Sequence, residues 1–450
     1  MRLWLIPLTY ALVALIMGFG IPRLEQDYFA AYSSISPASA QAFLSSVASG
    51  MMALTGIVFS VAFVMVQFSA IAYSPRLVMW FARDPSLFHS LGFFIATFIY
   101  SLWELFWIDR GGSGKVPWVS TAIVVILLIC SMGLFARLIQ RVSDLTISNV
   151  LEIIGDRGRE VLEDMFERLD EEGQAGTEPS PASTAHLGPA IQTIMYYGEP
   201  RAIAQLDLAK LVRTARHLDA VFVMARSVGD TLFDGNPLLY VHGARERVDE
   251  ARLMRAVQVK PERTFQQDPK YPLRLLVDIA IKALSPAIND PTTAVQALDQ
   301  IEDLLLRLGR RDLDAGYARD RTGKVRLIYP MPTWEDYLAL AFDEIRHYGS
   351  GSLQVMRRLR STLVELADSL INAERSAAVR RYMRHLDLAV ERLPFDDEDR
   401  AKARQEDRQG LGLTRKPEAK TASVVAAATD PSRPSMAPSG ASSLPQSRSS

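Results

Sequence analysis

The sequence predicts an α-helical membrane protein with four N-terminal transmembrane helices, followed by a mostly helical α+β cytosolic domain that contains a small β unit. Long apolar stretches fill the first third of the 450 residues and do not recur later. A membrane helix needs about 20 mostly apolar residues to cross a hydrocarbon core of about 30 Å. The later segments instead mix helical periodicity with short alternating runs. The apolar stretches are residues 3–21, 43–72, 87–108 and 116–139.

The first stretch also has one feature of a signal peptide, because Arg2 precedes its apolar core. No small-residue cleavage site of the A-x-A type follows Gly20 and Ile21, which favours a retained helix. Buried helices of a soluble domain usually carry a polar face, whereas residues 119–135 contain no charge. We therefore expect a four-helix transmembrane region over residues 1–142.

Lysine and arginine in the short loops predict the orientation of these helices. One side of the membrane has more basic loop residues than the other, and its excess grows when Arg157 and Arg159, which follow the fourth helix, are included. Its charges would lie in the cytoplasm, together with the N-terminus and the C-terminal domain. The basic residues on this side are Arg2, Arg76, Arg83, Arg137 and Arg141, against Arg23, Arg110 and Lys115 on the other.

Composition excludes several classes of function. The 50 basic and 51 acidic residues nearly cancel, so no electrostatic basis for binding nucleic acid is present. The single cysteine, Cys130, lies in the fourth apolar stretch and cannot form an intramolecular disulfide. Since no C-x-x-C pair exists either, the sequence predicts no zinc or thiol redox site of that type.

The second apolar stretch has a face of small residues at four-residue spacing. Such a face lets another helix approach closely, and packing is the simpler interpretation. The functional interpretation is that this face lines a solvated path, with Gln67 near its cytoplasmic end and Arg76 beyond it. The small residues are Ser45, Ser49 and Ala53, Ser46 with Gly50, and Gly56 with Ser60.

The third apolar stretch carries an acidic residue, Glu104, between Trp103 and Trp107. An ionisable group inside a membrane predicts a proton or cation site. However, tryptophan favours the membrane interface, and Glu104 lies about one turn from Asp109 and Arg110, which also fits an interfacial anchor.

The cytosolic part begins with a membrane-proximal helix and linker over residues 143–188. Helical periodicity continues from Arg137 to about Glu172, and its acidic residues have the distribution of a solvated face. A loop rich in Pro, Ser and Gly follows over 173–188. The α+β domain over 189–393 is predicted to contain strands at 191–197, 220–226, 238–241 and 325–329, and a charged loop at 310–324. Helices are predicted at 207–217, 353–370 and 375–393, and many arginines of the last two should lie outside.

The most distinctive cytosolic segment is a corner between two helices. An amphipathic helix over 271–284 ends at Ser285-Pro286, and the next helix begins with Asp290 as N-cap and Pro291 as its first residue. A sharp corner needs such residues for structural reasons alone. Ser285, Asn289 and Asp290 also form a candidate site for a ligand, a cation or a partner subunit. After Thr333, which should cap a further helix, and Pro394, a charged and then Ala-, Ser- and Pro-rich tail over 394–450 predicts disorder.

Two groups of motifs resemble a known family. Residues 278–284 (D-I-A-I-K-A-L) and the following S-P-A-I-N-D-P-T-T-A are similar to a signature of bacterial predicted membrane proteins known as domain of unknown function 2254. Around the second and third helices, Q-F at 67–68, Y-S-P-R at 73–76, R-D at 83–84, L-G-F at 91–93 and T-F-I-Y at 97–100 also resemble that family. Ala70-Ile71-Ala72 departs from the small or polar residues expected there. The resemblance implies four membrane helices with a cytosolic domain in the bacterial inner membrane, and it implies no reaction.

Catalytic signatures are missing from the sequence. No H-E-x-x-H, P-loop, G-x-G-x-x-G or G-x-S-x-G motif occurs, so an enzyme is unsupported, and we expect neither a cofactor nor a metal. The lipid bilayer and further copies of the chain are the expected partners, with a small ligand or ion. Three hypotheses follow: an oligomeric channel or transport-associated protein with a cytosolic regulatory domain, a membrane-anchored ligand sensor or scaffold without transport, or a membrane enzyme. The third would need a pocket with paired acid–base groups.

Overall fold

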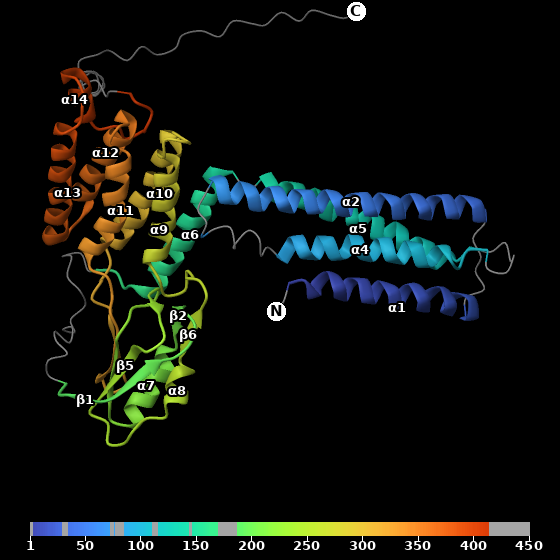
Figure 1. Cartoon of the computed structure of the whole chain (residues 1–450), viewed down its shortest axis with the longest axis horizontal. Helices are drawn as coiled ribbons and strands as arrows, with labels where there is room; N and C mark the ends of the chain where they lie inside the picture. Colours follow the sequence, from blue (N-terminus) through green and yellow to red (C-terminus); the bar gives the residue numbers. More distant parts are fainter. Residues whose placement is uncertain are drawn as a thin grey trace, which may run out of the picture. The chain divides into compact units, whose positions relative to one another are not determined.

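The computed structural model describes residues 3–28, 35–72, 76, 85–109, 116–143, 146–169 and 187–413. Within these ranges, four helices are long and apolar enough to cross a membrane, which confirms the predicted fold class in its membrane part. Figure 1 shows them running alongside one another. They are α1 (Leu5–Tyr28), α2 (Pro37–Ala72), α4 (Pro85–Leu105) and α5 (Trp118–Ser143).

Helix α4 is the centre of this bundle, because it contacts α1, α2 and α5. A glycine makes the closest approach possible: a Cβ at Gly92 would lie 2.8 Å from a ring carbon of Tyr10 on α1. Small residues commonly allow such contacts between membrane helices. Phe94 and Tyr100 of α4 and Leu44 of α2 are fully buried between the helices.

The small-residue face of α2 is open within the described part of the chain. A Cβ placed at Gly50 or Gly56 would meet no atom within 4 Å. Ala53, Gly56 and Ser60 line a shallow groove on the outside of the helix. The packing predicted for this face is therefore not made with α1, α4 or α5.

Helix α6 (Ile147–Met165) follows α5 as a separate helix and ends earlier than the predicted residue 172, because Phe166 is extended. It packs against α10 (Pro291–Leu308) through two glycines. A Cβ at Gly155 would lie 2.1 Å from Gln300 Oε1, and one at Gly158 would lie 2.8 Å from Leu304 Cδ1. Residues 170–186, which include most of the predicted linker, lie outside the described residues.

Helices build the larger body of the part that follows the membrane helices, and Figure 1 shows them side by side. The predicted caps are confirmed: Asp290 Oδ1 accepts a hydrogen bond from Thr293 N at 3.1 Å, and Thr333 with Asp336 forms a capping box. The core of this body includes Leu276, Leu298 and Phe342. The helices are α9 (Lys270–Ala283), α10, α11 (Trp334–Tyr348), α12 (Leu353–Ser369) and α13 (Ala373–Glu391).

The prediction that the arginines of residues 353–370 lie outside is wrong for three of them. Arg357, Arg358 and Arg360 are buried. Arg358 donates to Asp299 Oδ1 at 2.8 Å and to Glu302 Oε2 at 2.6 Å, both on α10. Arg360 likewise pairs with Asp387 of α13, and such pairing offsets the cost of removing the guanidinium groups of Arg358 and Arg360 from water.

The prediction of disorder from residue 394 is also wrong for its first part. Residues Asp397–Ala403 form α14, and the chain then folds back on α12 as far as residue 412. Gln354 Nε2 donates to the carbonyl of Gly410 at 2.6 Å, and Arg357 Nη1 donates to that of Gly412 at 2.8 Å. Residues 414–450 lie outside the described residues.

The small β unit contains two sheets in the described residues. A five-stranded sheet has the order β1-β5-β3-β8-β7, in which only β3 and β8 pair in parallel, and a three-stranded sheet has the order β4-β2-β6. Helices α7 (Leu208–His217) and α8 (Glu250–Met254) accompany them. The strands are β1 (Ala190–Tyr196), β2 (Arg201–Leu206), β3 (Val221–Met224), β4 (Thr231–Leu232), β5 (Asn236–His242), β6 (Val257–Lys260), β7 (Tyr317–Arg319) and β8 (Val325–Ile328).

The four predicted strands are confirmed as β1, β3, β5 and β8. Strand β2 was not predicted, because Arg201–Leu206 is buried on both faces at its centre and does not alternate. Strand β7 lies inside the stretch predicted as a charged loop, and its three residues are all half-buried.

Replacement of Gly158 by valine should destabilise the docking of α6 on α10, because its side chain would overlap Leu304 and Pro272. We expect a loss of about 1–3 kcal/mol, typical of overpacking, as a lower melting temperature of the full-length protein in detergent. Gly351→Val is the control, since a Cβ there meets no atom within 4 Å. Equal melting temperatures for the two variants would contradict this account of the α6–α10 contact.

Candidate functional site

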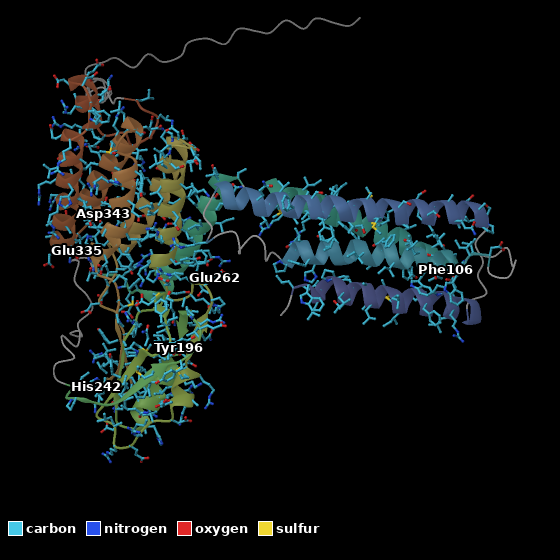
Figure 2. All side chains as sticks on the ribbon, in the orientation of Figure 1. Phe106, Tyr196, His242, Glu262, Glu335 and Asp343 are labelled. Atoms are coloured by element: carbon cyan, nitrogen blue, oxygen red, sulfur yellow. The ribbon has the colours of Figure 1, made fainter. Side chains whose placement is uncertain are left out.

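A cleft of about 700 Å³ lies in the part of the chain that follows the membrane helices, between α6 and the loop that joins β6 to α9. Glu262, which Figure 2 labels, belongs to this loop. Clefts of this size commonly bind small molecules. Side chains from α6, from the ends of β2, β6 and β8, and from the loop line its walls.

Gln267 anchors the loop to the end of β2. Its backbone has a φ of +53°, an unusual conformation for a residue with a side chain. The side-chain amide of Gln267 pairs with the backbone of Leu206 in the way a neighbouring strand would. Leu206 N donates to Gln267 Oε1 at 2.9 Å, and Gln267 Nε2 donates to Leu206 O at 3.2 Å. This arrangement fixes the position of the next residues, Asp268 and Pro269.

A buried ion pair lies directly behind the cleft. Asp268 is 1% exposed, and its Oδ2 accepts a hydrogen bond from Arg263 Nε at 2.9 Å. Burial raises the pKa of Asp268, although the Arg263 guanidinium acts in the opposite direction. Gly229, with a φ of +90°, leaves room for the pair, because a Cβ there would lie 2.3 Å from Asp268 Oδ2.

The polar lining of the cleft combines three basic residues with two acidic ones, Glu160 and Asp164. Arg157 forms an ion pair with Glu160 at 2.7 Å. Lys270 Nζ donates to Ser227 Oγ at 3.1 Å, whereas Lys260 makes no hydrogen bond or ion pair among the described residues. Two ammonium groups are therefore available to an anionic ligand.

The rest of the lining is largely apolar and includes Met165, Phe265, Tyr329 and Met331. Burial raises the pKa of Tyr329, so its hydroxyl stays neutral at physiological pH. A lining of this kind suits a small organic anion with an apolar portion better than it suits a bare inorganic ion.

The predicted corner residues lie elsewhere and have local partners. Ser285 Oγ donates to the carbonyl of Lys282 at 2.7 Å, and Asp290 caps α10 through Thr293. Asn289 is exposed, with a φ of +49°. These contacts build the turn between α9 and α10, and a ligand role for the corner stays a prediction.

The predicted membrane residues do not form one group. Gln67 is exposed near the end of α2. Arg76 forms an ion pair with Asp278 of α9, and Asp278 Oδ1 also accepts a hydrogen bond from Arg274 Nε at 2.7 Å. Glu104 is fully buried at the end of α4, where Thr121 Oγ1 lies 2.6 Å from its Oε1.

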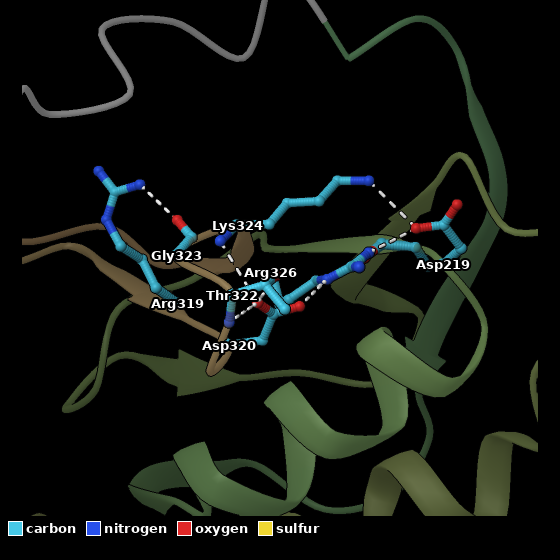
Figure 3. Close-up of polar contacts among 8 residues, drawn as sticks. Asp219, Arg319, Asp320, Thr322, Gly323, Lys324 and Arg326 are labelled. Carbon is cyan, nitrogen blue, oxygen red and sulfur yellow. Dashed lines mark hydrogen bonds and ion pairs between the residues drawn. The ribbon is translucent and has the colours of Figure 1, made fainter.

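A second polar group stabilises the edge of the five-stranded sheet (Figure 3). Arg326 is buried and donates to Asp320 Oδ2 at 2.7 Å and to Asp219 Oδ1 at 2.9 Å. Hydrogen bonds from Thr322 and Arg326 hold the pKa of Asp320 well below its usual range, and Arg326 and Lys324 lower the pKa of Asp219. Because these groups satisfy one another, they join the β7–β8 turn to β3 and offer no open binding position.

With this geometry described, comparison with known proteins identifies the family. A family model described as "Predicted membrane protein (DUF2254)" matches residues 1–365. The chain belongs to the DUF2254 family. The match covers the membrane helices, the cleft and most of the helical body, so the family resemblance predicted from the motifs is confirmed. The motif residues 73–75 and 83–84 lie outside the described part of the structure.

Two mycobacterial proteins are similar over most of their length. They are the uncharacterized protein Mb1321c of Mycobacterium bovis and the uncharacterized protein Rv1290c of Mycobacterium tuberculosis. Each is 29% identical over 378 residues, which cover 81% of this DUF2254 chain and 71% of the relative. No solved structure matches the chain.

The cleft was not predicted from the sequence. Its signal is the polar run Glu262–Lys270 between β6 and α9, but such a run is also what an exposed loop looks like. Nothing local indicates that Gln267 folds back on β2 or that α6, about 100 positions earlier, forms the opposite wall. Only the three-dimensional arrangement brings these segments together.

Replacement of Asp320 by asparagine should remove part of the acid sensitivity of the sheet. The folded pKa of Asp320 is lowered, so its stabilising contribution is present above the unfolded pKa of about 3.9 and is lost as the pH falls below it. We expect Asp320→Asn to melt at a lower temperature than the wild type at pH 7. The difference should shrink as the pH falls below 4, measured by thermal unfolding in detergent.

The control for this experiment is Asp314→Asn. Asp314 is exposed, and its carboxylate makes no hydrogen bond or ion pair among the described residues. A constant difference between Asp320→Asn and the wild type from pH 7 to pH 3 would contradict the proposed electrostatic role.

Proposed function

We propose that this protein is a ligand-regulated protein of the bacterial inner membrane, with its N-terminus and its large C-terminal part in the cytoplasm. In this proposal the cleft binds a small organic anion, and the membrane helices respond as part of an oligomeric channel or transport-associated protein. The basic residues around Arg76, Arg137 and Arg141 support this orientation.

The observation that supports regulation most directly is the position of α6. This helix begins at Ile147, a few residues after α5 ends at Ser143, and it supplies Arg157, Val161 and Met165 to the cleft. A ligand that contacts both α6 and the β6–α9 loop would favour one position of α6. Differential binding of this kind is what shifts a conformational equilibrium.

A second connection supports the same proposal. Arg76, beyond the end of α2, pairs with Asp278 on α9, and Arg274 joins Asp278 to Glu344 of α11, with Arg274 Nη2 at 2.7 Å from Glu344 Oε2. The other end of α9 begins at Lys270, in the wall of the cleft. One helix therefore carries both a cleft residue and the partner of Arg76.

The binding prediction uses the full-length protein in detergent and a panel of pyrophosphate, citrate and adenosine monophosphate. We expect at least one of these anions to raise the melting temperature, because Lys260 and Lys270 each bring an ammonium group to the lining of the cleft. The variant Lys260→Glu, Lys270→Met should weaken that binding by at least about tenfold, the loss expected for about 1.4 kcal/mol of interaction.

The control for the cleft is Arg213→Glu, which reverses an exposed charge on α7, whose residue Arg213 is not part of the lining. Stabilisation of the wild type and the control, but not of the cleft variant, supports the proposal. If no anion stabilises the wild type, or if all three proteins respond equally, the cleft is not the proposed anion site.

Transport and sensing differ in one measurable consequence. Protein reconstituted in vesicles would release a trapped ion or solute on addition of the binding anion if the bundle conducts. A sensor or scaffold would bind the anion without flux. The exposed small-residue face of α2 is the specific feature that favours the oligomeric, conducting alternative.

We expect Gly56→Ile to prevent assembly of copies through α2. A Cβ at Gly56 meets no atom within 4 Å in one chain, so a larger side chain leaves the monomer intact but fills the groove beside Ala53 and Ser60. Light scattering after size-exclusion chromatography should show a lower mass for this variant. Gly133→Ile on α5 is the control, because a Cβ there also has open space. A wild type that is already monomeric, or a variant of unchanged mass, contradicts this interface.

A further inference from the structure

A cluster of buried polar side chains lies at one end of the membrane bundle, where α1 and α4 end and α5 begins. Glu25, Tyr100, Glu104 and Ser120 are each at most 5% exposed. Two of their polar atoms, Glu104 Oε2 and the hydroxyl of Tyr100, are buried and have no hydrogen-bond partner in the part of the chain that the structure describes. Burial of such atoms costs free energy, so the cluster needs a chemical explanation.

The two carboxyl groups of the cluster have different surroundings. Glu25 caps α5: its Oε1 accepts from Val119 N at 2.9 Å, and its Oε2 accepts from Ser120 N and Ser120 Oγ, each at 3.1 Å. These three donors at the positive end of a helix stabilise an ionised carboxylate. Among the described residues, Glu104 has no backbone donor and contacts a single hydroxyl, that of Thr121.

The two contacts of the Thr121 hydroxyl indicate the protonation state of Glu104. Its oxygen lies 2.6 Å from Glu104 Oε1 and 2.8 Å from the carbonyl oxygen of Pro117. A hydroxyl has one hydrogen and can donate to only one of these acceptors at a time. Both contacts are hydrogen bonds only if Thr121 donates to Pro117 while a protonated Glu104 donates to Thr121 Oγ1.

We propose that Glu104 is a reversible proton-binding site of the membrane bundle. On release, the O–H bond at Glu104 Oε1 breaks, the electron pair stays on the carboxylate, and a solvent water molecule accepts the proton to form hydronium. The Thr121 hydroxyl then rotates from Pro117 O and donates to Glu104. Protonation therefore changes a contact between α4 and α5, the helix that precedes α6.

Few other ionisable groups face this position. Helix α1 contributes Glu25, whose negative charge favours a neutral Glu104, while Arg23 is exposed. Helix α2 has no ionisable residue, and α5 contributes only hydroxyls near Glu104. Tyr100 lies on α4 itself, and the exposed Asp109 follows it. No basic group among the described residues lies against Glu104, and an unpaired carboxylate is costly there.

Buried hydroxyls continue the polar surface along the same helices. Thr97 Oγ1 lies 3.3 Å from Ser131 Oγ across the α4–α5 contact, and Ser101 Oγ donates to Thr97 O at 2.8 Å. These groups are close enough to exchange hydrogen bonds and extend the polar surface further into the bundle. They do not carry the proposal, which rests on the contacts of Glu104.

The test is infrared difference spectroscopy of the full-length protein in lipid vesicles during a pH titration. We expect the carbonyl band of a protonated carboxylic acid, shifted by exchange into deuterated water and lost at high pH. In Glu104→Gln this band should be missing, because glutamine imitates the protonated state. In Glu25→Gln it should persist, because both carboxylate oxygens of Glu25 accept hydrogen bonds from the start of α5 and the band is assigned to Glu104. A wild type without the band, or a Glu104→Gln variant that keeps it, overturns the proposal.

Thermal unfolding provides a second measurement that does not depend on the variant spectra. The melting temperature of wild-type protein should fall as the pH rises through the titration of the band, whereas that of Glu104→Gln should stay level over the same interval. A parallel pH dependence of the two proteins would show that Glu104 does not exchange its proton. Neither result depends on the cytosolic cleft or on its ligand.

Discussion

The close contact between α6 and α10 is the constraint on which the arrangement of the part after the membrane helices depends. Gly155 and Gly158 allow the two helices to approach so closely that α6 becomes part of the helical core. From that position α6 also forms a wall of the cleft opposite the β6–α9 loop. A larger residue at either glycine would displace the helix that follows the membrane part and would open the cleft at the same time.

The described structure handles its buried charges in two ways. In the part that follows the membrane helices, the buried arginines Arg326 and Arg358 form ion pairs with carboxylates. In the membrane bundle, Glu25 is satisfied by the first amides of α5, while Glu104 has one hydroxyl neighbour. Because the buried arginines are paired with carboxylates, their role is structural. Glu104 has incomplete pairing, so it can gain or lose a proton.

Sequence reasoning predicted what depends on local pattern. The apolar lengths of α1, α2, α4 and α5, the cap at Asp290 and the capping box at Thr333 follow from neighbouring residues, and they are confirmed. The cleft could not be predicted, because Arg157, Leu206 and Lys260 meet only through tertiary contacts. The prediction that Arg357 lies outside and the prediction that residues 397–412 are disordered failed for the same reason. A charged segment has the sequence pattern of a solvated one, and its buried partners lie far away in the sequence. The sequence indicated that Glu104 is unusual, but it did not show that its side chain is buried inside the bundle.

The cap that Glu25 provides for α5 has a consequence for how the protein is made. The acceptor for the amide of Ser120 lies 95 positions earlier in the chain, on the first helix. Helices that enter the bilayer one after another would leave the start of α5 without that acceptor until α1 lies beside it. Biogenesis of the membrane part is thus complete only when its first helix meets its last. A chain without α1 would therefore also lack the carboxylate that caps the first amides of α5.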